Sequence, residues 1–202
     1  MKTKRYLLLA VFFLATATAA APVLGESLAF KEQIYDMGPL KPLDSVLKVA
    51  EGEMAPDFTL PSVGGEKIAL SSFRGSRHVM LSFVPAAWTP VCSDQWPGYA
   101  IARPLFDRYN AVILGITVDN LPTLFAWTRQ MGDIWFPVLS DFWPHGEVAD
   151  RYGVLRGDGT AERALIFVDK NGKIRKIHVG DINERPKLDL IVATLKEMNA
   201  AP

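Results

Sequence analysis

The stretch "HVMLSFVPAAWTPVCSDQW", residues 78–96, joins a nearly continuous apolar run to a loop that contains two prolines. The apolar run, His78–Val84, is typical of a central β-strand that is covered on both faces. The loop ends at Cys92, the only cysteine in the 202 residues, and apolar residues at helical spacing follow it. This order predicts a buried strand, a loop and then a helix that begins close to Cys92.

Strands and helices alternate along the rest of the chain. Residues 57–60 and 67–70 flank the pair Gly64-Gly65, which is typical of a β-hairpin. Alternation of this kind favours an α/β domain, and a late hairpin followed by a final helix is a thioredoxin-like ending. We therefore expect a thioredoxin-like fold: a central mixed sheet flanked by helices, with an N-terminal β-hairpin extension. Further strands are expected at 111–119, 136–141, 163–169 and 174–180, and helices at 93–109 (kinked near Pro104), 121–132, 144–154 and 185–198.

The first residues have the order of a secretory signal. Residues 1–5 are basic, and residues 6–25 carry no charge and end in small side chains. We expect residues 1–21 to be a signal peptide, although an N-terminal membrane anchor of similar length would have the same pattern. Residues 22–51 contain the chain-breaking pairs Gly38-Pro39 and Lys41-Pro42 and have little apolar pattern, so they are expected to form a linker or tether. Both alternatives place the domain, residues 52–202, outside the cytoplasm, in the periplasm or another extracytoplasmic compartment.

Charge and cysteine content narrow the function classes. Lys and Arg together number 22, as do Asp and Glu, so the formal net charge is zero. Nothing in that balance indicates a nucleic acid partner. A single cysteine in an exported chain cannot form an internal disulfide. Cys92 is therefore a reactive thiol, part of an intermolecular bond, or a buried and inert small side chain.

The predicted position of Cys92 favours a thiolate. The N-terminus of a helix exposes unpaired N–H groups and a partial positive charge, and both stabilise an anion. An ordinary thiol has a pKa of about 8.5, and a pKa near 6.5 requires about 2.7 kcal/mol of stabilisation. A helix terminus usually contributes about 0.3–1 kcal/mol and at most about 2. We therefore expect a cation, most reasonably an arginine, beside the sulfur.

Two further residues of the loop could contribute to the chemistry at Cys92. Thr89 lies three residues before Cys92, and its hydroxyl could donate to or accept from an incoming oxygen. Pro85 stiffens the loop and removes an N–H group. Each also has a structural alternative, because Thr89 could cap the helix and Pro85 could end the strand.

The spacing P-x-x-x-T-x-x-C, formed by Pro85, Thr89 and Cys92, resembles the active-site loop of the peroxiredoxins. The "SDFWPHG" stretch is similar in particular to the one-cysteine alkyl hydroperoxide reductase E type. The resemblance covers roughly residues 52–197. The other stretches that agree with the family are "APDFTLPSVGG", "LGITVD", "LSDFWPHGEVADRYGV" and "RALIFVDKNGKI".

The resemblance implies a thiol-dependent peroxidase that reduces hydrogen peroxide or organic hydroperoxides without a cofactor. Cys92 would be the peroxidatic nucleophile that becomes a sulfenic acid. Thr89 would bind the peroxide oxygens, and Pro85 would shield the thiolate from water. Arg163, at the start of a late strand, would supply the missing cation, lower the cysteine pKa and orient the O–O bond.

Two positions depart from the family pattern. Gln95 stands where many relatives have Glu, so the amide can accept hydrogen bonds from Arg163 without adding a negative charge. Pro97 stands where one subgroup has a resolving cysteine. The sulfenic acid would therefore need an external thiol or a thioredoxin-like reductant. The family also leads us to expect a homodimer.

Alternative functions have weaker support. A thioredoxin-like thiol–disulfide protein of the envelope would need a C-x-x-C pair, which is absent from the sequence. An inactive binding module that kept the fold would have no need of the four peroxiredoxin residues. A hydrophobic rim for a lipid peroxide, core packing or a subunit interface are alternatives for the aromatic residues Trp135, Phe142 and Trp143. No metal is expected, since the histidines have no ligand spacing: His78, His145 and His178.

Overall fold

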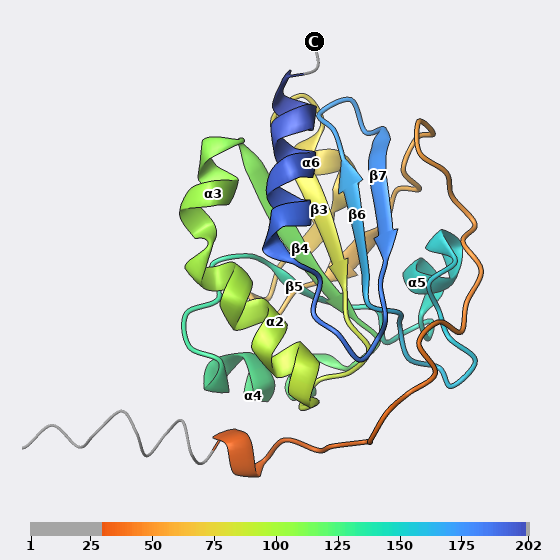
Figure 1. Ribbon diagram of the computed structural model, residues 1–202, viewed down its shortest axis with the longest axis vertical. Helices are drawn as coiled ribbons and strands as arrows, with labels where there is room; N and C mark the ends of the chain where they lie inside the picture. Colours follow the sequence, from red (N-terminus) through yellow and green to blue (C-terminus); the bar gives the residue numbers. More distant parts are fainter. Residues whose placement is uncertain (1–29, 201–202) are drawn as a thin grey trace, which may run out of the picture.

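The computed structural model describes residues 30–200 and places a five-stranded sheet at the centre of the molecule (Figure 1). The strand order is β5-β4-β3-β6-β7. All six residues of β3 are buried, as expected for a central strand covered on both faces. The strands are β3 (His78–Phe83), β4 (Ala111–Thr117), β5 (Val138–Ser140), β6 (Ala164–Val168) and β7 (Ile174–Val179).

The sheet is mixed, as the sequence predicts. Strand β3 pairs in parallel with β4 and antiparallel with β6, and β6 pairs antiparallel with β7. In the β3–β6 register, Phe83 at the end of β3 lies opposite Ala164 at the start of β6. This register brings the residue that precedes β6 to the end of the sheet where the loop after β3 begins.

Helices cover both faces of the sheet (Figure 1). Alternate residues of β3 point to opposite faces, so Met80 packs with α2, α4 and α6, whereas Leu81 packs with α5. The predicted kink near Pro104 is a full break at Ala102, where α2 ends and α3 begins. The helices are η1 (Leu70–Phe73), α2 (Pro90–Ile101), α3 (Arg103–Arg108), α4 (Leu121–Gln130), α5 (Glu147–Tyr152) and α6 (Leu188–Ala200).

The predicted N-terminal hairpin is present. Strands β1 (Thr59–Pro61) and β2 (Lys67–Ala69) pair antiparallel. Gly65 in the turn has a φ of +95°, a conformation that residues with a side chain rarely adopt. Phe58 and Leu60 bury their side chains in the same core cluster as α5, so the hairpin helps to cover that face of the sheet.

The N-terminal segment differs from the simple tether that its sequence suggests. Gly52 N donates to Ile174 O over 2.7 Å, and Ile174 N donates to Glu53 O over 2.8 Å. Further upstream, Lys48 N donates to Tyr152 O. These are backbone contacts, which leave no apolar periodicity in the sequence, so the pattern could not indicate that the segment lies along the domain.

The expected signal peptide, residues 1–21, lies outside the described residues. Among the helices of residues 30–200, none has both the length and the apolar character needed to cross a bilayer.

Candidate active site

Cys92 lies in the first turn of α2. Thr89 is the residue that precedes the helix, and Pro90 is its first residue. The first helical hydrogen bond runs from Ser93 N to Thr89 O over 3.0 Å. The Cys92 N–H therefore precedes the hydrogen-bonded ladder and lies at the positive end of the helix dipole.

The guanidinium group of Arg163 reaches the sulfur of Cys92. Both terminal nitrogens, Nη1 and Nη2, lie 3.6 Å from Cys92 Sγ. The Nε of Arg163 donates to Ile182 O over 2.9 Å and so fixes the direction of the side chain. Both residues are buried, Cys92 fully and Arg163 with 2 % of its surface exposed. The cation expected from the sequence therefore stands beside the thiol in a site that excludes bulk water.

Gln95 holds the same guanidinium from the other side. Arg163 Nη1 donates to Gln95 Oε1 over 2.7 Å, and Gln95 is fully buried. No carboxylate among residues 30–200 forms an ion pair with Arg163. Burial raises the pKa of the neighbouring Tyr99, so that its phenol stays protonated and adds no negative charge. The positive charge of Arg163 is thus surrounded by neutral groups and by the cysteine.

Thr89 does not cap the helix with its side chain. Its hydroxyl donates instead to Ala86 O over 2.9 Å, across the loop. Because the single hydroxyl proton is used in this way, the lone pairs of Thr89 Oγ1 are left to accept a hydrogen bond. An incoming hydroperoxide has an O–H group that can donate it. The structure thus favours an acceptor over a donor for this hydroxyl.

The loop between β3 and α2 is held in a strained conformation. Trp88 has a φ of +62°, which a bulky residue with a side chain adopts only at a cost of about 1–3 kcal/mol. Two contacts fix the loop on either side of it. Ala87 N donates to the Asp119 carboxylate over 2.8 Å, and Tyr35 N donates to Trp88 O over 2.7 Å. The loop held in this conformation places Thr89 directly before α2 and Cys92 in its first turn.

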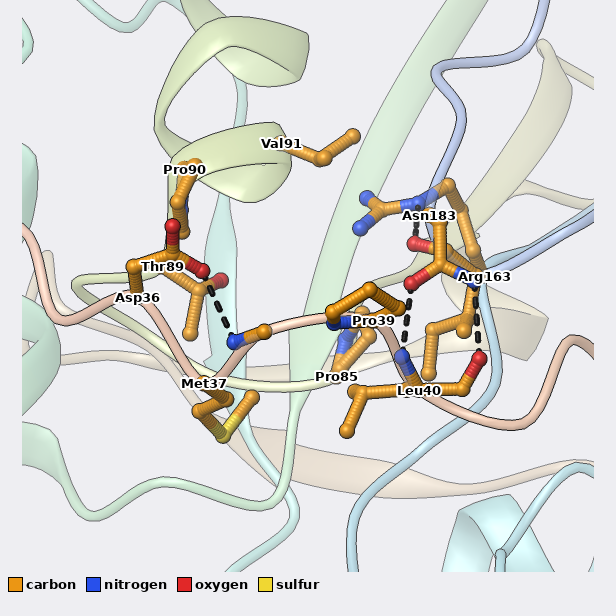
Figure 2. Close-up of a pocket in the computed structure, with 12 residues that line it drawn as sticks. Asp36, Met37, Pro39, Leu40, Pro85, Thr89, Pro90, Val91, Arg163 and Asn183 are labelled. Carbon is orange, nitrogen blue, oxygen red and sulfur yellow. Dashed lines mark hydrogen bonds between the residues drawn. The ribbon is translucent and has the colours of Figure 1, made fainter.

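A cavity of about 320 Å³ opens above this arrangement (Figure 2). Pro85, Thr89 and Arg163 line it, and Cys92 and Gln95 lie beneath the lining residues rather than on the cavity surface. The remaining lining residues come from the loop, from the start of α2 and from two distant segments of the chain: Asp36, Met37, Gly38, Pro39, Leu40, Pro90, Val91, Ile182 and Asn183.

All five residues singled out in the sequence therefore meet at one end of the sheet. Pro85 follows β3, the loop and α2 contribute Thr89, Cys92 and Gln95, and Arg163 directly precedes β6. The distance in sequence between Cys92 and Arg163 is bridged by the antiparallel pairing of β3 and β6. No structural finding separates any of the five from the others.

The outer wall of the cavity was not predicted from the sequence. Leu40 and Asn183 are fastened to each other, with Leu40 N donating to Asn183 Oδ1 over 2.8 Å and Asn183 Nδ2 donating to Leu40 O over 2.9 Å (Figure 2). The only signal available was the short polar cluster "GDIN" that follows the last strand, which reads as an ordinary turn.

The other candidates from the sequence lie away from this site. Within residues 30–200 there is no group of three or more potential ligand side chains that could hold a metal ion. Trp143 and Phe142 are exposed and do not line the cavity, and Trp135 packs against Phe106 and Phe136. The hydrophobic rim considered for these aromatic residues is therefore not part of the cavity above Cys92.

A cysteine at a helix start beside an arginine is an arrangement found in thiol-based redox proteins. Residues 52–177 match the family model described as the AhpC/TSA family. The chain belongs to this family, whose members are peroxiredoxins, and the match begins where the sequence predicted the compact domain to begin.

Individual relatives agree. The chain is 39 % identical over 125 residues to "Alkyl hydroperoxide reductase E" of Mycobacterium tuberculosis, which covers 61 % of this chain and 81 % of the relative. It is 30 % identical over 159 residues to a chloroplastic 2-cysteine peroxiredoxin of Chattonella marina var. antiqua, covering 74 % and 80 % of the two chains. The resemblance found in the sequence motifs is thereby confirmed.

Solved structures show the same fold. The reduced 2-Cys peroxiredoxin of Plasmodium vivax superposes with a TM-score of 0.68 at 26 % identity, over 73 % of this chain and 81 % of that one. Mycobacterium tuberculosis AhpC superposes with a TM-score of 0.69 over 75 % and 94 %, and its 21 % identity supports the fold alone. The expected thioredoxin-like fold is confirmed.

Proposed function

We propose that this protein is a one-cysteine peroxidase that reduces hydrogen peroxide or organic hydroperoxides with Cys92 as its nucleophile. The observation that carries the proposal is the pair of 3.6 Å contacts from the Arg163 guanidinium to Cys92 Sγ, with no carboxylate in residues 30–200 paired to that guanidinium. A cation held beside a thiol by neutral partners favours the thiolate, which is the reactive form.

The reaction is a displacement at oxygen. The Cys92 thiolate attacks the terminal oxygen of R–O–O–H, an S–O bond forms, and the O–O bond breaks. The sulfur is oxidised to a sulfenic acid, Cys–SOH, and the departing RO⁻ takes a proton from solvent and leaves as an alcohol, or as water when R is hydrogen. Negative charge moves from sulfur to the leaving oxygen, so fixed donors and the helix dipole lower the barrier.

The neighbouring residues position the peroxide. Thr89 Oγ1, with its proton used on Ala86 O, accepts a hydrogen bond from the hydroperoxide O–H. Arg163 borders the cavity and contacts the sulfur at the same time, so that it is placed to orient the O–O bond. Pro85 lines the cavity without offering an N–H group to water.

Regeneration needs a thiol from outside the chain, because Cys92 is the only cysteine. A first external thiol attacks the sulfenic acid and releases water, which leaves a mixed disulfide. A second thiol releases Cys92 and carries away the external disulfide. A small thiol and a thioredoxin-like protein are both suitable donors, and assays with each against the oxidised protein identify the one that works.

Rapid mixing of the reduced protein with peroxide tests the assignment. We expect fast oxidation in a single turnover, followed through intrinsic tryptophan fluorescence or by trapping of the sulfenic acid. The Cys92→Ser variant keeps the size of the side chain and should lose the reaction entirely. Peroxide consumption by Cys92→Ser at the rate of the unaltered protein would contradict the proposal.

We also propose that the protein works outside the cytoplasm, as a homodimer. The basic and then uncharged order of the first residues supports export, and the family supports dimerisation. The N-terminal sequence of the mature protein tests the first proposal: a start near residue 22 indicates cleavage, whereas a start at Met1 indicates a retained anchor. Analytical ultracentrifugation tests the second.

A further inference from the structure

Residues 35–44, here called the strap, cross the mouth of the cavity above Cys92 (Figure 2). They precede the region that matches the family model, which begins at residue 52. Asp36, Met37, Pro39 and Leu40 of the strap line the cavity together with Pro85 and the start of α2 (Figure 2). A wall of the candidate active site is therefore built from residues outside the matched family region.

The strap is fastened at both ends and in the middle. At its start, Tyr35 N donates to the carbonyl of the strained residue Trp88 over 2.7 Å. In the middle, the Asn183 side chain makes two hydrogen bonds to the backbone of Leu40, accepting from Leu40 N over 2.8 Å and donating to Leu40 O over 2.9 Å. At its end, Asp44 N donates to the buried carboxylate of Glu162 over 2.6 Å. Backbone groups pinned in this way fix the positions of the side chains between them.

The wall that the strap forms is mainly apolar. Met37, Pro39 and Leu40 contribute three of its side chains, and Val91 faces them from α2. The polar groups that would hold the O–O bond, Thr89 and Arg163, line the same cavity. A hydroperoxide bound by its oxygens there would place its organic group among the apolar side chains that complete the lining.

The size of the cavity limits that group. A volume of about 320 Å³ is at the lower end of the range of roughly 300–1,000 Å³ that is usual for small-molecule sites. Such a cavity suits a compact branched alkyl or aryl group. Hydrogen peroxide has no carbon, so it gains nothing from an apolar wall.

We propose that the strap is the specificity-determining wall of the active site, and that Met37 and Leu40 favour hydroperoxides with a compact apolar group over hydrogen peroxide. The proposal rests on the proposed peroxidase function. It assigns no part in bond breaking to the strap, which acts only on the organic group of the substrate.

The test compares two second-order rate constants for the oxidation of Cys92, one with cumene hydroperoxide and one with hydrogen peroxide. In Leu40→Ala the ratio of the first to the second should fall about tenfold, because the lost apolar contact amounts to roughly half of a buried leucine side chain. Val46→Ala is the matched control: it alters an 82 % exposed apolar residue of the same N-terminal segment that does not line the cavity.

A second variant tests the position of the strap and leaves its apolar side chains in place. Asn183→Ala removes both hydrogen bonds to Leu40 while leaving every apolar side chain of the wall in the chain, and it should lower the same ratio. A ratio equal to that of the unaltered protein in Leu40→Ala would overturn the proposal, including the case in which both rate constants fall together. Failure of the peroxidase function itself is distinguishable, since the unaltered protein would then not react with hydrogen peroxide.

Discussion

Two buried arginines at the same end of the domain have opposite surroundings. Arg156 is closed in an ion pair, with Nη1 2.8 Å from the Glu162 carboxylate, and both side chains are at most 2 % exposed. Arg163, one residue beyond Glu162, is equally buried but contacts only the neutral oxygens of Gln95 and Ile182 and the sulfur of Cys92. One charge is neutralised by the protein, and the other is left to act on a thiol.

The sequence places an acid near each arginine, with Asp158 two residues after Arg156 and Glu162 directly before Arg163. The direction of each side chain from the backbone decides which pair forms. Consecutive residues of an extended chain point in opposite directions. Glu162 therefore turns toward Arg156 and the strap, where it also accepts from Asp44 N, while Arg163 turns toward Cys92. The difference teaches that burial of a charge alone does not indicate function; the absence of a neutralising partner does.

The largest expected effect is on stability. Replacing Arg156 by Met leaves the Glu162 carboxylate buried without its partner, which should lower the free energy of unfolding by about 3–5 kcal/mol. Urea denaturation measures it. The double variant Arg156→Met/Glu162→Leu should recover most of the loss, and the folded protein should react with hydrogen peroxide at a nearly unchanged rate. A double variant as unstable as Arg156→Met would show that the unpaired Glu162 carboxylate does not cause the loss of stability.

Replacement of Arg163 should act on the reaction instead. Arg163→Met removes the donors that face the sulfur but leaves only neutral groups unpaired, so the fold should survive. The rate constant for peroxide at pH 7 should fall about 10²–10³-fold, the loss usual for a donor that stabilises charge in a transition state. Stopped-flow mixing measures this rate. A variant that reacts at an undiminished rate would remove Arg163 from the mechanism.

Asp141 extends the comparison, because it is a buried acid with no arginine paired to it in residues 30–200. Asp141 accepts hydrogen bonds from Val148 N and Ala149 N at the start of α5, and burial raises its pKa to about 6. A carboxyl with a higher pKa in the folded chain binds more protons there than in the unfolded chain. The free energy of unfolding should therefore decrease by up to roughly 2 kcal/mol as the pH rises from about 4 to about 6.

Urea denaturation midpoints measured between pH 4 and pH 6 test whether Asp141 causes this loss of stability. In Asp141→Asn the contribution of this residue disappears, so the stability of the variant should change less between pH 4 and pH 6 than that of the unaltered protein. An identical slope in both proteins would mean that another group titrates.

The smallest effect is expected from a substitution that gives Arg163 a carboxylate partner, as Arg156 already has. Gln95→Glu places a carboxylate 2.7 Å from Arg163 Nη1 and neutralises the guanidinium. The reaction with peroxide should slow about tenfold at neutral pH, because the added carboxylate neutralises the cation that stabilises negative charge during the reaction. Gln95→Leu, which adds no charge, is the matched control. Equal rates for the two variants would contradict the electrostatic explanation.

Much of this site could be predicted from the sequence, because it depends on local order. The apolar run of β3, the prolines of the loop and the single cysteine at a helix start are all visible in residues 78–96. The identity of Arg163 came from the family resemblance, since only the β3–β6 register brings it to Cys92. The strap and the Leu40–Asn183 contacts could not be predicted, because backbone hydrogen bonds across distant segments leave no pattern of residue types.

The central claim is that Arg163, which contacts Cys92 Sγ through both terminal nitrogens at 3.6 Å, makes this sulfur reactive. The most direct test measures the rate constant of the Cys92 thiol with the neutral alkylating agent iodoacetamide at pH 7, in the unaltered protein and in Arg163→Met, with Cys92→Ser as the blank. Loss of the guanidinium should lower this rate constant about tenfold. Equal rate constants for the two proteins would contradict the account.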